Sequence, residues 1–492
     1  MHGLSAPPGL PRLGLALLLL LVTSCKSGEP RVDGADSRPD HRLSDGPASD
    51  RPALDLTPDF LPADAIHVDD LGDGKTGSGT AADPYRDLQQ ALDSAPDGAT
   101  LLIHAGSYAA SPVAYSDPGC GNCSDADFAQ GASATRGFLV GGKALHLWGE
   151  GPDKTVLVTG AGYGVLFEDA GSSSIGRLKV TGGKRDADGK ATDAGVVVRR
   201  TKLLAQQVSV SGNDDLYTGP LPDPIVGVGG IFGREQAELT ILDSVIEDNS
   251  WDGIALYRGV PGKPGSGPTA LVQGCRIGCT SGCVNPRGRG VGIGITWDAK
   301  LTALGNVVHH YWKGIGSFGT SVVEARNNVV RDQHGWGIVA SGSSTMHAVN
   351  NVVLRSGTTG MAAWSSGVQG SFVNNIVVGN GIAADEWVGK KTGVWFNASA
   401  LSFKLAYNLI YDNKEHDVCT GGTPGGVACT ALPFEGVNGN LSLDPKLVGG
   451  DDVHLQPGSP ATDAGDPAIK DQDGSSSDLG AYGGPDAPST LP

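Results

Sequence analysis

The sequence predicts an all-β fold, a right-handed parallel β-helix in which coils of 22 or 23 residues stack on one another. Two landmarks repeat along the chain with this period. The first is a glycine followed by an apolar residue, at Gly164, Gly195, Gly230, Gly253, Gly292, Gly314, Gly337, Gly360 and Gly393. The second is an asparagine followed by two aliphatic residues, at Asn306, Asn328, Asn351, Asn375 and Asn408. Self-similarity at such a spacing is typical of a solenoid, and the longer gaps between glycines indicate insertions.

Composition supports the same fold class. The 492 residues include 76 Gly and 30 Pro, and only 18% are charged. Such a chain is too apolar for disorder and too rich in turn residues for a helical fold. Leucine-rich repeats have a similar period, but they need a fixed leucine framework, and leucine is sparse in the repeats of this chain. The net charge of -17 argues against nucleic acid as a partner, because phosphate binding needs a basic surface.

Each coil is expected to hold three short strands, for example over residues 338–340, 346–349 and 352–354. We expect the repeating asparagine at a tight corner that tolerates positive φ, with its amide bonded to the asparagine of the next coil. The ends of a parallel stack have unpaired edges and need caps. A short N-terminal capping helix is predicted within residues 85–95, where apolar residues follow helical spacing at Leu88, Ala91, Leu92 and Ala95.

The N-terminus predicts a secretory signal over residues 1–24. Arg12 precedes an apolar run that ends in Val22-Thr23-Ser24-Cys25, the pattern of a lipoprotein signal. We therefore expect lipidation of Cys25, with an ordinary signal peptide cleaved nearby as the alternative. The predicted address is the cell envelope, outside the cytoplasm, on the outer membrane or cell surface, with the lipid as the sole membrane contact. Residues 25–62 are expected to form a disordered tether, 63–485 the β-helix and 486–492 a disordered tail.

Seven cysteines remain if Cys25 carries lipid, and in an oxidising compartment disulfides are the default. Cys419 and Cys429 bracket a glycine-rich loop and are expected to pair. Two more bridges are expected within two groups, and one thiol must be left over; the groups are Cys120 with Cys123, and Cys275 with Cys279 and Cys283. Zinc binding by Cys120-x-x-Cys123 is the alternative, but no second matching pair supports it.

Two blocks of sequence resemble a known family. The opening block contains Val68-Asp69-Asp70, Asp83-Pro84-Tyr85 and His104-Ala105-Gly106-Ser107-Tyr108. The closing block contains Leu443-Asp444-Pro445, His454-Leu455-Gln456-Pro457-Gly458 and Leu479-Gly480-Ala481-Tyr482. Both are similar to bacterial pectin-lyase-like β-helix proteins. The resemblance implies an exported β-helix with a polysaccharide groove, but that family includes lyases, epimerases, hydrolases and non-catalytic members.

Insertions cluster just before the repeating glycine, in residues 181–194, 212–229, 279–291 and 380–392. Loops stacked on one corner overhang the following strand and build a groove. The outward side chains of that strand are expected to be Glu168, Arg199, Arg234, Tyr257, Thr296, Phe318, Ser341, Trp364 and Asn397. Arg199, Arg234 and Lys313 would form a positive stripe that suits uronate carboxylates, and aromatic faces would stack on sugar rings. The predicted substrate-binding residues are Arg199, Arg234, Trp312, Trp336 and Trp364, with a solvated face for the arginines and packing between coils for the tryptophans as alternatives.

A cluster on two neighbouring coils suggests catalysis. Removal of the C5 proton of a uronate needs a base, a cation near the carboxylate and often an acid. The base is expected to be His310 or His334, with Lys313 or Arg331 as the cation, Asp332 close by, and Tyr257 or Tyr311 as the acid. Glycoside hydrolysis is the alternative chemistry, with Asp252 paired with Asp298 or Asp332.

The sequence thus predicts a monomeric lipoprotein that binds an acidic polysaccharide and processes it by lyase-like or epimerase-like proton abstraction. A non-catalytic surface glycan binder or adhesin is the rival from another class. No cofactor or metal is expected. Calcium would require the oxygen-rich turns at Asp471-Gln472-Asp473-Gly474 or at Asp69, Asp70 and Asp73, which we interpret as solvated turns.

Overall fold

The computed structural model describes residues 62, 64–71, 76–215, 227–280, 290–383, 390–400, 403–422 and 428–492. The predicted signal peptide, the lipidation site Cys25, and Asp73, Cys283 and Trp387 lie outside this set, as does the predicted tether except for residue 62. All described residues belong to one compact unit, Leu56–Pro492. Among them, no helix has both the length and the apolar character that crossing a bilayer requires.

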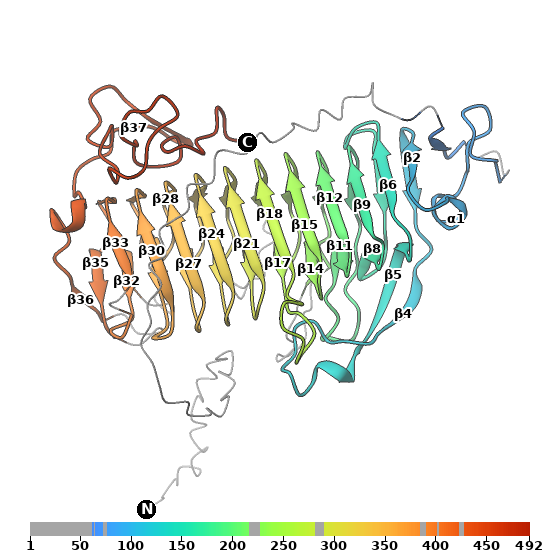
Figure 1. Cartoon of the computed structure of the whole chain (residues 1–492), viewed down its shortest axis with the longest axis horizontal. Helices are drawn as coiled ribbons and strands as arrows, with labels where there is room; N and C mark the ends of the chain where they lie inside the picture. The colour runs from blue at the N-terminus through green and yellow to red at the C-terminus, as the bar shows by residue number, and fades with distance from the viewer. Residues whose placement is uncertain are drawn as a thin grey trace, which may run out of the picture. The chain divides into compact units, whose positions relative to one another are not determined.

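The described residues form a parallel β-helix (Figure 1). Each coil adds one strand to each of three sheets, and each strand pairs in parallel with its equivalents in the coils before and after it. β26 (Trp336–Ala340), β27 (Thr345–Val349) and β28 (Val352–Leu354) make one such coil, so the three strands predicted there are confirmed.

Sheet 1 contains, in spatial order, β1 (Ile66–Val68), β2 (Ala99–Ile103), β6 (Leu145–Gly149), β9 (Ser172–Gly176), β12 (Lys202–Gln206), β15 (Glu238–Leu242), β18 (Thr269–Gln273), β21 (Lys300–Leu304), β24 (Val322–Arg326), β27, β30 (Gln369–Val373) and β33 (Lys404–Ala406). Sheet 2 contains β3 (Gly106–Ala109), β7 (Thr155–Val158), β10 (Lys179–Thr181), β13 (Ser209–Ser211), β16 (Val245–Glu247), β19 (Arg276–Gly278), β22 (Val307–His309), β25 (Val329–Arg331), β28, β31 (Ile376–Val378) and β34 (Leu409–Tyr411).

Sheet 3 follows the corner that carries the insertions. It contains β4 (Val113–Asp117), β5 (Ala132–Gly141), β8 (Tyr163–Glu168), β11 (Ala194–Arg199), β14 (Gly229–Arg234), β17 (Ile254–Leu256), β20 (Val291–Ile295), β23 (Lys313–Ser317), β26, β29 (Met361–Ala363), β32 (Thr392–Phe396), β35 (His416–Thr420) and β36 (Thr430–Ala431). The pairings of β4 with β5 and of β35 with β36 are antiparallel, so the direction of pairing changes at both ends of this sheet.

The repeating glycine lies where sheet 3 begins, and the space inside the coil explains it. A Cβ on Gly314 would clash with the Val330 side chain and with the carbonyl oxygen of Gly337 in the next coil. The residue after each glycine, such as Ile315 or Ile338, points inward into the main core, as the sequence predicts. The motif therefore combines a close approach between two strands with an inward aliphatic side chain.

The repeating asparagine forms a buried ladder at the corner between sheets 1 and 2. Nδ2 of Asn328 donates to Oδ1 of Asn351 at 2.9 Å, and Nδ2 of Asn351 donates to Oδ1 of Asn375 at 3.0 Å. The predicted bond between successive asparagines is confirmed, but the predicted positive φ is not. The left-handed residue is the one before, such as Asn327 or Asn350, both with φ of 56°. The ladder residue itself is placed to point its amide inward.

The N-terminal end of the stack is capped by α1 (Leu88–Ser94). Asp87 is its N-cap and accepts a hydrogen bond from the backbone N–H of Gln90 at 2.7 Å. Leu88, Ala91 and Leu92 are buried in the main core, so the predicted capping helix is confirmed. The short 3-10 helices η2 (Phe128–Gln130) and η3 (Val437–Gly439) lie in connections.

After η3 the chain turns back along the outside of sheet 2 (Figure 1). β37 (Leu447–Gly449) and β38 (Asp452–Leu455) form a small antiparallel sheet in this segment. Its apolar side chains cover the outward residues of sheet 2, which include Val307, Val329, Val352, Ile376 and Leu409. Asn327 donates to the carbonyl oxygens of Ala481 and Gly483. The last residues, expected to be disordered, also contact the stack, since Asp486 pairs with Arg326 at 3.1 Å.

Replacing Asn351 with Ala should destabilise the stack, because Asn351 is fully buried and links three coils. Its loss leaves donors of Asn328 and the carbonyl of Ala325 without partners, at a cost of about 1–3 kcal/mol for each group. We expect the free energy of unfolding to fall by at least about 2 kcal/mol in urea denaturation. Gln369→Ala, which removes an exposed amide side chain from β30, is the control and should change little.

Candidate functional site

Three histidines meet at the corner between sheets 2 and 3. His309 ends β22, and His310 follows with a φ of 58°. Asp332 has a φ of 55° at the same corner of the next coil, and His334 follows it. The His310 and His334 rings have centroids 6.4 Å apart, so the predicted placement on neighbouring coils is confirmed. His309 is buried, His310 is half-buried and His334 is exposed, so the cluster opens toward solvent.

His310 is held on one side by His309. The two Nδ1 atoms are 3.0 Å apart, and Nε2 of His309 lies 3.1 Å from Oε1 of Glu247. Burial, followed by the neighbouring His309, lowers the pKa of His310, although Asp332 acts in the opposite direction. His310 is therefore biased toward the neutral form that a general base requires.

Asp332 and Arg331 belong to a salt-bridge network. Asp332 accepts from Arg331 at 2.8 Å and from Arg355 at 2.6 Å, and Asp451 pairs with both arginines. Burial alone would raise the pKa of Asp332, but hydrogen bonds from the two arginines outweigh it and lower the pKa. Because two carboxylates already neutralise Arg331, the structure does not support its predicted role as the cation for a substrate carboxylate.

Lys313 lies at the start of β23, and its Nζ is 5.9 Å from the centroid of the Phe318 ring on the outer face of sheet 3. Asp252 is buried close to it and accepts a hydrogen bond from the N–H of Val291 at 2.7 Å. Burial raises the pKa of Asp252 to about 7, against the opposing effects of that N–H and of Lys313. A carboxyl group with such a pKa exchanges its proton at neutral pH.

Tyr257, predicted as an acid, is only 4% exposed and packs edge-on against Phe232, with ring centroids 5.3 Å apart. Burial and the Asp252 carboxylate raise its pKa well above the ordinary value. Its place in the outward column is as predicted, but its hydroxyl does not reach solvent. Tyr257 is therefore corrected to a packing residue.

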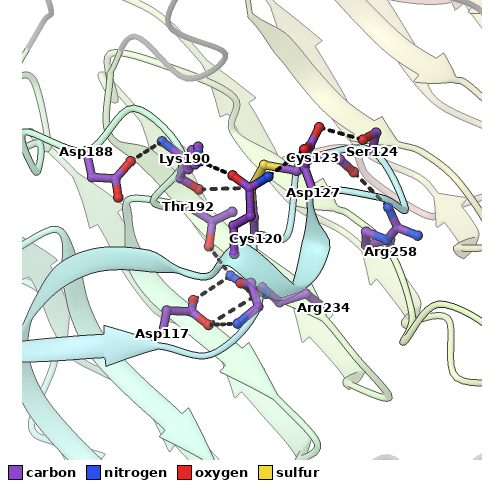
Figure 2. The surroundings of a disulfide bond; sticks show 12 residues. Asp117, Cys120, Cys123, Ser124, Asp127, Asp188, Lys190, Thr192, Arg234 and Arg258 are labelled. Carbon is purple, nitrogen blue, oxygen red and sulfur yellow. Dashed lines mark hydrogen bonds and ion pairs between the residues drawn. A yellow bond between two sulfur atoms is a disulfide. The ribbon is translucent and has the colours of Figure 1, made fainter.

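Arg199 and Arg234 also lie in the predicted column, directly above one another, but they are buried, with 2% and 0% of their surface exposed. Arg234 donates to Asp117 at 2.7 Å (Figure 2). Arg199 donates to Glu235 at 2.7 Å. These arginines compensate carboxylates inside the protein. The predicted positive stripe for substrate is therefore wrong for Arg199 and Arg234.

The cover over these arginines is the segment of residues 111–131, which starts with β4 and carries the Cys120–Cys123 disulfide (Figure 2). Arg258 secures its far end, since it donates to the Cys123 carbonyl at 2.7 Å and lies between the Phe128 and Trp297 rings. The zinc alternative for Cys120 and Cys123 is thus wrong. The predicted Cys419–Cys429 disulfide is confirmed, Cys279 is disulfide-bonded and Cys275 is a buried free thiol.

The tryptophans divide into packing and surface residues. Trp336 and Trp312 are 1% and 8% exposed and pack with Val339, Ala362 and Trp395 on the outer face of sheet 3. Their predicted role in direct sugar contact is wrong, because neighbouring coils cover their faces. Trp364 is half-buried, with its ring centroid 4.3 Å from that of Trp336. Trp297 and Phe318 are also half-buried, so aromatic surface remains on this face.

Two titratable groups of the β-helix were not predicted. Glu247 contacts His309, and the equal spacing of Glu247, Gly278 and His309, 31 residues each, was the signal for it. The second group is a carboxyl pair in the first insertion. Asp193 is hydrogen-bonded to Asp186, and both are buried. Burial and the Asp186 charge raise the pKa of Asp193 well above the ordinary value, which favours its protonated form.

The comparisons with known proteins agree with this architecture. Residues 229–423 match the family described as right handed beta helix region. The protein is a right-handed parallel β-helix. The match confirms the predicted fold class, whereas no curated protein matches the sequence.

Solved structures with a similar fold are distant. The A-module of the mannuronan C-5 epimerase AlgE4 from Azotobacter vinelandii is 13% identical, covers 79% of this chain and 100% of its own, and has a TM-score of 0.41. The pectate lyase Pel9A is 11% identical, covers 85% and 96%, and has a TM-score of 0.37. The GH136 lacto-N-biosidase from Eubacterium ramulus is 11% identical, covers 77% and 67%, and has a TM-score of 0.36. Such similarity describes the fold of the β-helix alone.

Asp193→Asn should make the stability of the β-helix less dependent on pH. The native protein holds a proton at Asp193 above the unfolded pKa of about 3.9, so stability falls as pH rises from there toward the raised native pKa. The variant keeps an oxygen for the N–H of Asp186 but binds no proton. Urea denaturation at pH 5 and pH 7 should show a smaller loss of stability with pH in the variant. The control Asp153→Asn, at an exposed turn, should retain the wild-type loss.

Proposed function

We propose that the β-helix processes an acidic polysaccharide by removing the C5 proton of a uronate residue, as a lyase or an epimerase does. The observation that carries this proposal is the His310–His334 pair, two imidazoles on adjacent coils with ring centroids 6.4 Å apart at the edge of sheet 3. One side chain serves as base and the other as acid, which a proton abstraction followed by proton return requires.

His310 is assigned as the base, because its lowered pKa favours the neutral form. Lys313 is assigned to the uronate carboxylate, since a cation there stabilises the negative charge that develops after C5 loses its proton. In a lyase reaction His334 gives a proton to the leaving C4 oxygen as the C4–O4 bond breaks. In an epimerase reaction His310 keeps the abstracted proton, and His334 gives its own proton to C5 from the opposite face.

The aromatic surface of sheet 3 is assigned to sugar stacking. Phe318 and Trp364 are both half-buried and lie two coils apart, with Ser341 between them. Strand spacing separates such residues by about 9.6 Å. Aromatic faces at this spacing give a glycan apolar contacts along the stack. We further propose that lipid on Cys25 anchors a monomeric β-helix in the cell envelope.

Glycoside hydrolysis is a second candidate because of Asp252. A buried carboxyl group with a pKa of about 7 has the property of a general acid, which gives its proton to a leaving oxygen at neutral pH. Hydrolysis also needs a second carboxylate across the scissile bond. Of the two partners predicted for it, Asp332 is neutralised by arginines, and Asp298 accepts the N–H of Gly259 in a loop.

Incubation with pectate, alginate and glycosaminoglycans should yield unsaturated products, followed by ultraviolet absorbance, or a changed epimer ratio, followed by proton NMR. His310→Ala and His334→Ala should each lower kcat by at least about 100-fold, because general acid–base catalysis contributes on that scale. His347→Ala, which removes a half-buried histidine bonded to Ser371 on sheet 1, is the matched control. Full turnover by both site variants would contradict the assignment, and binding of a polymer without any product would favour the non-catalytic binder.

Asp252→Asn distinguishes the two chemistries. If proton abstraction by His310 is the reaction, the variant should keep its products and lose little activity. If Asp252 is a general acid, the variant should lose reducing-end release by at least about 100-fold, and the alkaline limb of its pH profile should disappear. Ultraviolet absorbance and proton NMR measure the first outcome, and a reducing-sugar assay between pH 5 and pH 9 measures the second.

A further inference from the structure

Glu247, Gly278 and His309 occupy equivalent positions in three successive coils of sheet 2. The register pairs Glu247 with Gly278 and Gly278 with His309. The outer two are therefore two coils apart, about 9.6 Å by strand spacing, yet their side chains are in hydrogen-bond contact at 3.1 Å. A Cβ on Gly278 would clash with the His309 ring, most closely with its Cε1 atom, so the glycine provides the space in which the ring reaches back to Glu247.

Glu247 is a committed hydrogen-bond acceptor. Its carboxylate receives Arg276 Nε at 2.7 Å and Arg276 Nη2 at 3.2 Å in addition to His309. Burial alone would raise its pKa, but hydrogen bonds from His309 and Arg276 lower the pKa of Glu247 to about 2. Because an ionised carboxylate only accepts, Nε2 of His309 must carry a proton.

The proton on Nε2 decides the role of the other His309 nitrogen. In neutral His309, Nδ1 is then an acceptor, and its neighbour at 3.0 Å is Nδ1 of His310. His310 must donate from Nδ1, which leaves its Nε2 as the nitrogen with a lone pair. We infer that Glu247 and His309 are positioning residues that fix His310 in the tautomer whose Nε2 accepts a proton.

This inference deepens the proposed function, because it rests on His310 as the base and explains how that base is oriented. A histidine base held by a second residue, itself held by a carboxylate, follows the general logic by which active sites choose a tautomer. The other charged groups around His310 are Asp332 and Arg331, which pair with each other, and His334 on the next coil. Glu247 and His309 approach His310 from sheet 2, whereas these groups lie toward the following coil.

The test is the tautomer of His310, read from its ¹⁵N chemical shifts in the folded protein at a pH where it is neutral, without any polysaccharide. Wild-type His310 should carry its proton on Nδ1. Glu247→Gln should shift the tautomer ratio toward Nε2–H by at least about fivefold, the change that one hydrogen bond of ordinary net strength produces. Glu324→Gln removes the same charge from the Glu324–Arg326 pair on sheet 1 and should leave the ratio unchanged.

Gly278→Ala is a second, independent variant, since it keeps Glu247 and His309 but pushes the ring away from the carboxylate. It should move the His310 tautomer in the same direction, and His309→Gln should do so as well. A wild-type His310 with its proton on Nε2 overturns the inference whatever the variants do. So does a ratio that Glu247→Gln leaves unchanged.

Activity separates this inference from the proposed function. If the His310 tautomer depends on Glu247 as expected while no uronate polymer is turned over, the positioning role of Glu247 and His309 is supported and the proposed function is contradicted. If turnover depends on His310 while its tautomer does not depend on Glu247, the proposed function is supported and the positioning role of Glu247 and His309 is contradicted. Where both hold, Glu247→Gln should lower kcat more than it changes KM and should shift the acid limb of the kcat profile.

Discussion

Hydrogen bonding at the coil corners is the constraint on which the remaining structure depends. Strand pairing satisfies the backbone within each sheet, but the corner between sheets 1 and 2 needs another solution. From Asn306 to Asn408 the side-chain amides supply it, each bonded to the asparagine of the next coil and to the backbone, and Asn440 ends the ladder. The ladder fixes the register of every coil that it crosses. Fixed register then makes columns of side chains, and columns are the units from which the candidate site is built.

Columns carry both the stability and the proposed chemistry. Arg199 and Arg234 stack in one column, where they neutralise Asp117, Glu168 and Glu235. Another column contains Glu247 and His309 on either side of a glycine. In the first, buried charges hold a covering segment in place. In the second, a carboxylate orients a histidine at the edge of a solvent-facing corner. Both columns arise from the same stacking of coils. Their roles differ because a segment covers the first column, whereas the second ends at a corner that faces solvent.

Local periodicity explains which predictions from sequence succeeded. The coil strands, the asparagine ladder, the inward aliphatic residues and the outward column are all set by residues within one or two periods. The exposure of a side chain is not set by residues within one or two periods, because it depends on segments that are distant in the sequence. Asp117 contacts Arg234 although the two residues are 117 positions apart in the sequence, and the repeat pattern does not predict that contact. The proximity of His310 and His334 was predictable from register, whereas the burial of Trp336 followed from packing between three coils.

The segment that returns along sheet 2 alters how the whole array unfolds. A linear array gains stability only between nearest neighbours, so its last coil frays without disturbing the others. Here Asn327, Asn350 and Asn374 bind the returning chain at successive coils, so these coils cannot unfold one at a time. Unfolding from that end must first break these contacts, which extend over several coils. Local opening there is therefore coupled to the unfolding of all the coils that the returning segment contacts.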